Sequence, residues 1–470
     1  MDKLFGLSVF FYEAQRSGKL PADNRVSWRG DSPIDLDGDQ EGGWYDAGDH
    51  VKFHLPLFYS AGRLALAAWR YAPALEASGF DGQTNMYWLR RELRWIMGYI
   101  MRCHPDIRTL VAQVGDGNVD HGYIGRAELM SVFRPVAKVT SSSPGPDLVA
   151  AAAGALAGCH LAFKGVDSAL AADCLRHAAS LYDWAASDPA TKAGKSYDEA
   201  VPGARAFYKS TGTYHHLLFA AATLFRATGD ARYSKDAVTW GTSPDANALY
   251  GAYKSYSDWP SWDNAWYEGA ALLLEAKQDP GGALGFKTQI VRMLNNWVNG
   301  KGDIKLSPKG QRFVSSWGSN RYAANAAAVA LLAADSLGPL AQSAKCFGVS
   351  QLHYLWGDSG RSFVVGVGVN PPKRPHHRNA ACTLSEGTAC SSLFMDPMPN
   401  PNVLHGALVG GPSAPDDKFP DDRSDYITSE VAVDYNAMYT VATAAAMSLG
   451  DAFWSGYPGN CVGLVPGVQF

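Results

Sequence analysis

The sequence predicts an all-α fold, and three observations point to it. Helical periodicity dominates the chain, alanine-rich segments recur along its whole length, and alternating patterns typical of strands are scarce. The best candidate strand is RSFVVGVGV at 361–369. Counted generously, the helix-compatible segments come to about ten to twelve, spread over the 470 residues.

The expected helices can be followed in chain order. The first two segments lie near 5–17 and 57–73. In MYWLRRELRWIMGYIM the apolar residues fall at i, i+4, i+7 and i+11, so one helix face carries Leu89, Leu93, Ile96 and Ile100. The alanine-rich segments are 148–163, 168–187, 214–227, 262–277, 320–337 and 431–449, and two further helix-compatible segments lie near 283–298 and 340–356.

Long loops rich in Gly, Pro and Asp separate these helices, at 23–50, 104–147, 300–318 and 364–425. Long loops without secondary structure are usually functional in compact domains. No charge run, low-complexity linker or change of composition marks a domain boundary. We therefore expect a single catalytic domain over residues 1–470, with loops that carry the chemistry.

Composition excludes some classes of partner. The chain has 41 basic and 45 acidic residues, a net charge of −4, so it lacks the electrostatic signature of a nucleic-acid-binding protein. No apolar run reaches the roughly 18 residues expected of a membrane span. Aromatic residues make up 12% of the chain and 14 are Trp, which favours flat platforms for sugar rings or bases, although any single Trp is more often core.

The N-terminal segment lacks the features of a signal peptide, so the protein is either cytosolic or a mature or truncated chain. Seven cysteines are too few and too scattered to predict a disulfide scaffold. Cys382 and Cys390 lie eight residues apart, which suits a local bridge in an oxidising compartment.

Two acidic clusters stand out. GGWYDAGDHVKF, at 42–53, holds Asp46 and Asp49 beside aromatic residues, where an ordinary turn is the simplest reading. A second cluster, FPDDRSDYITSEVAVDYNA at 419–437, contains Asp421 and also Glu430, which lies where a loop turns into a predicted helix. A helix start also favours acidic residues through the macrodipole, so neither cluster is diagnostic alone.

The segment NPPKRPHHRNAAC, at 370–382, adds a third set of polar residues. Its three prolines stiffen it, so that His376, His377 and Arg378 project from a rigid loop. No HExxH motif or zinc-spaced Cys pair accompanies them, which argues against a metal. Separated carboxylates, a His/Arg loop and aromatic platforms together favour hydrolysis of glycosidic bonds.

The motifs resemble those of glycoside hydrolase family 9, the endoglucanase family of animals, plants and bacteria. They cover nearly the whole chain in the family's order. The matching segments are FYEAQRSGKLPADNRVSWRGDS (11–32), GGWYDAGDHVKF, VGDGNVDHGYIGR (114–126), WGSNRYAANAA (317–327), SFVVGVGVNPPKRPHHR (362–378) and FPDDRSDYITSEVAVDYNA.

The resemblance implies an (α/α)6 barrel of about twelve helices with long catalytic loops, and cleavage of β-1,4-glucan with inversion. It makes Asp49 the base that activates water, Asp46 a residue that positions this water, and Glu430 the general acid. Other active-site positions of the family fall on His376, Arg378 and Asp421. Positions similar to the family's substrate contacts are His121, Trp317, Arg321, Tyr322 and Tyr435.

Some residues depart from the family's pattern. Family members often bind a structural calcium through an Asp-Glu pair, where this chain has His215 and His216. Imidazoles suit calcium poorly, so we expect no metal or other cofactor. Ala151 stands where the family often has a Glu, and no cellulose-binding module or linker is present.

The sequence thus predicts an endo-β-1,4-glucanase that acts on cellulose and related β-glucans. We expect a secreted monomer that binds β-1,4-glucan and neither nucleic acid nor membranes. Two alternatives stay open: a non-catalytic glucan-binding relative, and an enzyme specialised for another β-glucan or for chain ends. The sequence leaves undetermined the pH optimum and the other disulfide pairs.

Overall fold

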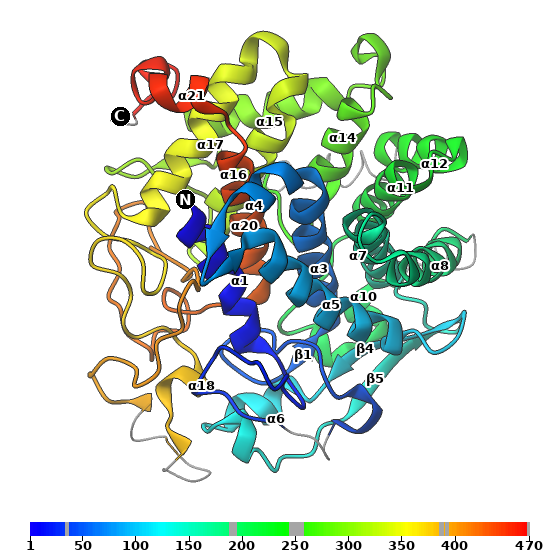
Figure 1. Cartoon of the computed structure of the whole chain (residues 1–470), viewed down its shortest axis with the longest axis vertical. Helices are drawn as coiled ribbons and strands as arrows, with labels where there is room; N and C mark the ends of the chain where they lie inside the picture. Colours follow the sequence, from blue (N-terminus) through cyan, green and yellow to red (C-terminus); the bar gives the residue numbers. More distant parts are fainter. Residues whose placement is uncertain (33–36, 188–194, 244–257, 385–389, 391–393, 468–470) are drawn as a thin grey trace.

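The computed structural model is mostly helical, which confirms the all-α prediction (Figure 1). It describes residues 1–32, 37–187, 195–243, 258–384, 390 and 394–467. Small parts of the predicted loops 23–50 and 364–425, at 33–36, 385–389 and 391–393, lie outside these described residues.

Twelve helices of the described chain alternate between an inner and an outer ring. Each inner helix packs against the next, and the last packs against the first, which closes the ring. The inner helices are α3 (His54–Arg70), α7 (Pro146–Phe163), α11 (Tyr214–Thr228), α14 (Trp266–Glu275), α16 (Ser319–Ala333) and α20 (Val433–Met447). The outer helices are α1 (Asp2–Gln15), α5 (Asn85–Cys103), α8 (Ser168–Ala185), α12 (Ala231–Thr242), α15 (Phe286–Asn299) and α17 (Ala341–Trp356). This arrangement is the predicted (α/α)6 barrel.

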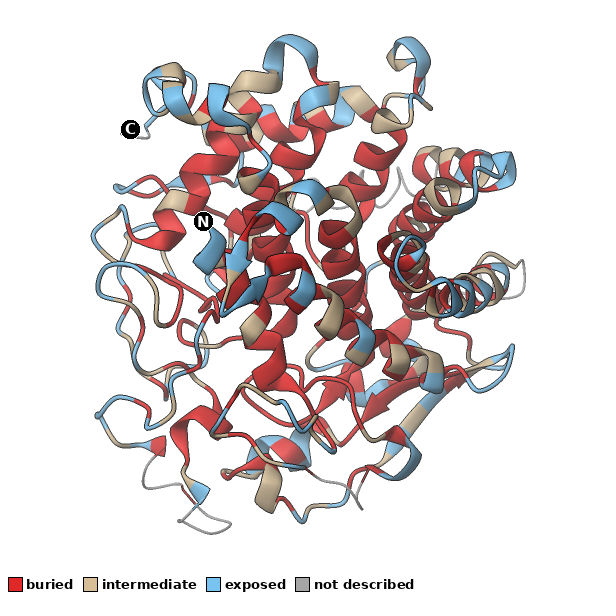
Figure 2. Cartoon of the chain, in the orientation of Figure 1, coloured by how far each residue is buried: buried red, intermediate tan, exposed pale blue. Residues whose placement is uncertain are grey.

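The inner helices are buried on nearly every side. A helix that is apolar all round is buried, and small side chains let neighbouring helices approach closely. Every residue of α20 from Val433 to Ala446 is buried. α7 is long and apolar enough to cross a membrane by length and composition, yet 94% of it lies inside the structure, as in a core helix. Figure 2 shows the same contrast between buried central helices and the partly exposed α8 and α12.

Four of the outer helices, α5, α8, α12 and α15, are amphipathic. In α5 the predicted face of Leu89, Leu93, Ile96 and Ile100 is fully buried. α12 was not expected, because ARYSKDAVTWGT has few apolar residues. Its start is nevertheless well defined, since the Asp230 carboxylate accepts a hydrogen bond from the N–H of Arg232 and caps the helix.

The strand prediction for 361–369 is wrong. Within this segment only Val364 forms a bridge, to Leu408. An antiparallel sheet forms elsewhere, in the order β1 (Lys52–Phe53), β4 (Thr109–Val114) and β5 (Val136–Thr140), and its strands β4 and β5 lie inside the predicted loop 104–147. Lys52 pairs with Val114, which brings the segment after Asp49 beside the segment before His121.

The remaining elements are short. Two-stranded sheets pair β2 (Gly79–Phe80) with β3 (Gln83–Thr84) and β6 (Lys305–Leu306) with β7 (Arg312–Phe313). The short helices are α4 (Ala72–Ala77), α6 (Gly117–Gly122), α10 (Tyr197–Ala200), α18 (Arg378–Ala381) and α21 (Asp451–Gly456). The 3₁₀ turns are η1 (Gly38–Gln40), η2 (Ala127–Leu129), η3 (Pro202–Ala204), η4 (Pro280–Gly282), η5 (Ala334–Ser336), η6 (Gly338–Leu340) and η8 (Gly459–Cys461). The loops that carry β1, β4, β5, α6 and α18 gather at one end of the molecule (bottom of Figure 1).

Six of the seven cysteines are paired, more than the sequence led us to expect. The predicted local bridge Cys382–Cys390 is present. Cys159–Cys174 links α7 to α8, and Cys346–Cys461 ties α17 to the C-terminal turn η8. The two cysteines of each of these pairs lie in different helices or turns, and only the packing of those elements brings them together. Cys103 is buried and unpaired.

Candidate active site

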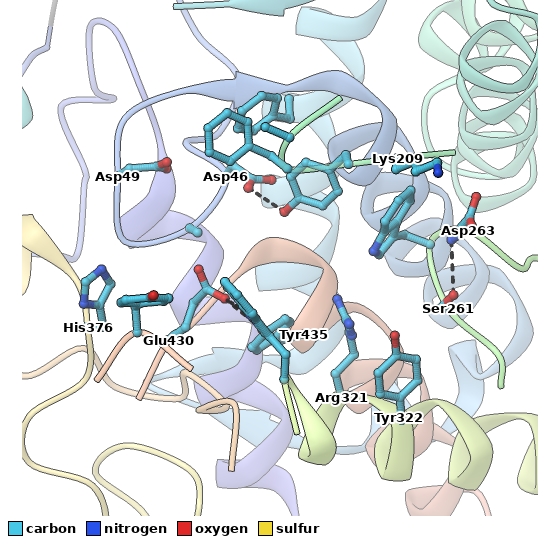
Figure 3. A pocket seen from close by; sticks show the side chains of 18 of the residues that line it. Asp46, Asp49, Lys209, Ser261, Asp263, Arg321, Tyr322, His376, Glu430 and Tyr435 are labelled. Carbon is cyan, nitrogen blue, oxygen red and sulfur yellow. Dashed lines mark hydrogen bonds between the residues drawn. The ribbon is translucent and has the colours of Figure 1, made fainter. Parts of the chain in front are cut away.

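A cleft of about 1150 Å³ contains ten of the eleven predicted site residues. Its walls come from loops and helix ends that are far apart in the sequence. Figure 3 shows Asp46 and Asp49 on one side, facing Glu430, His376 and Tyr435 on the other. The predicted residues in the lining are Asp46, Asp49, His121, Trp317, Arg321, Tyr322, His376, Arg378, Glu430 and Tyr435.

The loop that carries the two aspartates is bound to the other catalytic segments through its backbone. The carbonyl of Asp46 accepts from the N–H of Val433 at 2.8 Å, and that of Gly48 accepts from Arg378 at 2.9 Å. A Cβ at Gly48 would lie 2.1 Å from the carbonyl oxygen of His376. Only glycine therefore lets the aspartate loop and the histidine loop come this close.

Asp46 and Asp49 have opposite pKa shifts. Both are buried, with 3% and 4% exposure. Burial and the neighbouring Asp49 raise the pKa of Asp46, whose Oδ2 accepts a hydrogen bond from the hydroxyl of Tyr208 at 2.5 Å. Burial also acts to raise the pKa of Asp49, but the hydrogen bond and charge of His121 and the charge of Arg378 outweigh it and lower the pKa. Asp49 is thus the ionised member of the pair.

His121 donates from Nε2 to Oδ2 of Asp49 at 2.9 Å. Partial burial acts to lower the pKa of His121, but Asp49 raises it to about 9. Its ring stacks on Phe207 with centroids 4.9 Å apart. His121, predicted as a substrate contact, therefore also forms an ion pair with the predicted base.

Glu430 has the character of an acid. Burial raises the pKa of Glu430 to about 7, although hydrogen bonds from Trp317 and Tyr435 act against the rise. The indole of Trp317 and the hydroxyl of Tyr435 donate to Oε2 at 2.7 and 2.8 Å. Below neutral pH the cleft thus holds a protonated carboxyl opposite an ionised one, the arrangement that acid–base catalysis requires.

The histidine loop supplies two side chains to the cleft. The ring Nδ1 of His376 donates to the carbonyl of Arg423 at 2.6 Å, and burial lowers the pKa of His376 to about 4, so its ring is neutral. Arg378 donates from Nη2 to the carbonyl of His121 at 3.0 Å. Nε and Nη1 of Arg378 are buried without a partner in the described structure and are available to a ligand.

Asp421 is the one predicted site residue that lies outside the cleft lining. Its carboxylate accepts the backbone N–H groups of Lys373 and Arg374, at 3.0 Å each. It therefore holds the proline-rich loop in place and does not reach into the cleft. The resemblance predicts Asp421 as an active-site residue, whereas in the structure it supports the loop that carries His376 and Arg378 from outside the cleft lining.

Aromatic rings line the rest of the cleft. Trp317 is 44% exposed at the rim, and its ring contacts Tyr426 with centroids 5.5 Å apart. Arg321 forms an ion pair with Asp434 at 2.8 Å and lies over the rings of Tyr322 and Tyr435. Site residues that the motifs did not single out are Phe207, Tyr208, Lys209, Trp259, Trp262 and Asp263. The high density of aromatic residues in 207–214 and 259–267 is the sequence feature that could have identified them.

His215 and His216, which stand where the family often has an Asp-Glu pair, offer imidazoles in place of the carboxylate oxygens that calcium prefers. His215 and His216 are buried at the start of α11, and burial lowers the pKa of His215 to about 3. Both oxygens of the nearby Asp263 accept hydrogen bonds from Thr211, from its N–H at 2.8 Å and its hydroxyl at 2.6 Å. Ala151, in place of a Glu, is packed inside α7. The described residues contain no group of three or more His, Cys, Asp or Glu that could hold a metal ion.

Comparisons with known proteins agree with this geometry. The profile of glycosyl hydrolase family 9 matches residues 2–443. Endoglucanase B of Cellulomonas fimi is 41% identical over 454 residues, which are 93% of this chain and 41% of that protein. The chain thus spans less than half the length of this relative.

Solved structures are also similar. The endoglucanase of the termite Nasutitermes takasagoensis superposes with a TM-score of 0.84 at 37% identity, covering 95% of this chain and 98% of the termite chain. Endoglucanase CelQ of Clostridium thermocellum, solved in complex with cellotetraose, gives a TM-score of 0.80 at 34% identity, covering 94% of this chain and 69% of that one.

Proposed function

The chain belongs to glycosyl hydrolase family 9, and we propose that it is an endo-β-1,4-glucanase. In this proposal it hydrolyses internal β-1,4-glucosidic bonds of cellulose and related β-glucans with inversion of configuration. The observation that carries the proposal is the pair of facing carboxyls: Asp49 with a lowered pKa, and Glu430 with a pKa raised to about 7. Inversion requires one base and one acid on opposite faces of the sugar.

The reaction follows from these two states. The ionised Asp49 takes a proton from a water molecule, which attacks the anomeric carbon from the face opposite the leaving group. Asp46, held by Tyr208, hydrogen-bonds and orients the same water. Glu430 gives its proton to the glycosidic oxygen as the bond to the anomeric carbon breaks. One proton enters Asp49 and one leaves Glu430, so the charges of the two carboxyls exchange and solvent restores them.

Trp317 and Tyr435 support the acid step in two ways. Both donate to the same oxygen of Glu430, Oε2, which fixes the orientation of the carboxyl and leaves Oε1 to carry the proton. The same hydrogen bonds stabilise the carboxylate that remains after the proton is given up. The acid is thereby held neutral by burial and still able to ionise during the reaction.

The form of the cleft supports a polymeric substrate. Its volume of about 1150 Å³ exceeds that of an ordinary small-molecule site, and aromatic rings along it offer faces for successive sugar rings. The relative from Clostridium thermocellum has been solved with cellotetraose bound. We therefore propose β-1,4-glucan as the ligand. No observation favours a non-catalytic binding protein, since the acid, the base and the water-positioning residue are all present.

We also propose that the protein is secreted and works as a monomer, without calcium and without nucleic-acid or membrane partners. Three disulfides support an oxidising compartment. The imidazoles of His215 and His216 and the occupied oxygens of Asp263 support independence from calcium.

The proposal is tested with purified protein on carboxymethylcellulose. Reducing ends, viscosity and product sizes are measured together, and NMR of a soluble cello-oligosaccharide follows the first new ends. We expect viscosity to fall early relative to reducing ends, mixed product sizes, and α-configured new ends. Release of a single small product would indicate action at chain ends. β-Configured ends would indicate a retaining enzyme, and absence of new reducing ends would contradict catalysis.

A further inference from the structure

Gln15, the last residue of α1, holds the aspartate loop from behind. Its Nε2 donates to the carbonyl of Tyr45 at 3.2 Å and to that of Ala47 at 2.8 Å. These carbonyls flank Asp46 on both sides. Gln15 is fully buried and does not line the cleft, so it contacts the loop without contacting a substrate.

The other end of the same side chain holds the histidine loop. Oε1 of Gln15 and Nε2 of His377 are 2.7 Å apart. Nδ1 of His377 accepts the N–H of Ala380 at 3.0 Å, and burial keeps the pKa of His377 well below its usual value. The neutral ring must therefore carry its proton on Nε2 and donate to Gln15. This tautomer fixes the amide of Gln15, with its oxygen toward His377 and its nitrogen toward the two carbonyls.

We propose that Gln15 is a positioning residue for catalysis. It joins the loop of Asp46 and Asp49 to the loop of His376 and Arg378 through one rigid amide, and so fixes where the attacking water is held. Misplacement of reacting groups by a fraction of an ångström to one ångström is enough to cost a large factor in rate. The inference rests on the proposed function.

The loop has other anchors, so the loss of Gln15 should loosen it without unfolding it. Asp46 N–H and C=O bond to Val51 and Val433, and the N–H and C=O of His50 bond to Asp120 and Arg134. Arg16, which follows Gln15 at the end of α1, is fixed by a buried ion pair with Glu92. Removal of Gln15 would thus allow the loop only small movements, centred on Asp46.

The test compares Gln15→Leu and Gln15→Glu with the same changes at Gln351. Gln351 is a matched control because it is also fully buried and also holds two backbone groups, the carbonyl of Gly310 and the N–H of Arg312. None of these three residues lines the cleft. Each variant is assayed for kcat and KM on a soluble cello-oligosaccharide, well below its own Tm.

We expect Gln15→Leu to lower kcat by about tenfold or more while KM stays within about twofold. Gln15→Glu should lose less, because a buried carboxyl is readily protonated and can then donate to one carbonyl. Its kcat relative to wild type should therefore rise as pH falls, whereas that of Gln15→Leu should not. Both Gln351 variants should lower Tm and keep kcat within about twofold of wild type.

Three results would overturn the inference while leaving the proposed function intact. In the first, Gln15→Leu keeps kcat within about twofold of an active wild type. In the second, Gln15→Leu raises KM and leaves kcat unchanged. In the third, the Gln351 variants lose kcat as strongly as the Gln15 variants. An inactive wild type would instead contradict the proposed function.

Discussion

Replacing His121 with phenylalanine should move the acid side of the pH–activity profile. The histidine donates a charged hydrogen bond to Asp49 and is protonated over the working range, since its pKa is raised to about 9. Phenylalanine removes the charge and the hydrogen bond but keeps a ring to stack on Phe207. Asp49 keeps the positive charge of Arg378, so it remains able to ionise.

The size of the shift follows from the geometry. A hydrogen bond to a charged group is worth about 1.5–3 kcal/mol. The His121 side chain is 41% exposed, so solvent screening favours the lower end, about 1.5 kcal/mol. One pKa unit corresponds to about 1.4 kcal/mol. We therefore expect the pKa of Asp49 to rise by about one unit in the variant.

The sign of the change is defined by the two roles. The active form needs Asp49 ionised and Glu430 protonated, so activity rises with pH through the pKa of Asp49 and falls through that of Glu430, at about 7. A higher pKa of Asp49 moves only the acid limb, toward higher pH. The pH range over which kcat/KM is high should therefore become narrower, because its acid limb moves while its alkaline limb stays in place.

The measurement is kcat/KM on a soluble cello-oligosaccharide across the pH range in which each protein stays folded. His104→Phe serves as a control for the loss of a histidine, because His104 lies outside the cleft lining. An unchanged acid limb in the His121 variant would mean that Asp49 is not the group that must ionise. A shift of the alkaline limb alone would mean that Asp49 is the acid and Glu430 the base.

Three further predictions concern the acid, the base and the metal. Asp49→Asn should lower kcat about 10²–10⁴-fold with unchanged Tm, because an amide cannot accept the water's proton; a variant that kept more than about a tenth of the activity would place the base elsewhere. Glu430→Gln should abolish hydrolysis of cellulosic substrates but cost less on aryl glycosides with good leaving groups, which need little protonation; equal losses on both would argue against the acid role. Tm should be the same in excess EGTA and in millimolar calcium, and a rise of several degrees that saturates as a single site would show that other oxygens bind calcium.

The sequence located the parts of the site that lie within continuous motifs. The roles of Asp46, Asp49 and Glu430 are predicted from the resemblance of their motifs to glycoside hydrolase family 9, because neither acidic cluster is diagnostic alone. Most of the barrel helices could be predicted because alanine-rich and periodic apolar segments favour helix, but the ring to which each belongs could not, since the alanine-rich segment 168–187 forms the outer helix α8. Motifs and helix periodicity are both read from residues close together in the sequence, so neither requires knowledge of the fold.

Other features depend on contacts between distant segments. The strands β4 and β5 lie in what reads as a loop, and each is stabilised by a partner that sequence periodicity does not identify. Gln15 reads as a polar residue at a helix end, and only the closed barrel buries it. Tyr208 lies 162 residues from Asp46, so nothing near either residue announces their hydrogen bond.

The unequal distribution of positive charge explains how the three carboxyls of the cleft take different roles. Burial raises the pKa of all three, so it cannot distinguish them. Asp49 alone has cationic neighbours, His121 and Arg378, that overcome this effect. The hydrogen-bond donors of Asp46 and Glu430 are neutral hydroxyl and indole groups, and Arg321, on the wall of Glu430, is already paired with Asp434. Asp49 is thus the base because it lies beside positive charge that no other carboxylate neutralises. Glu430 is the acid because it has no such neighbour.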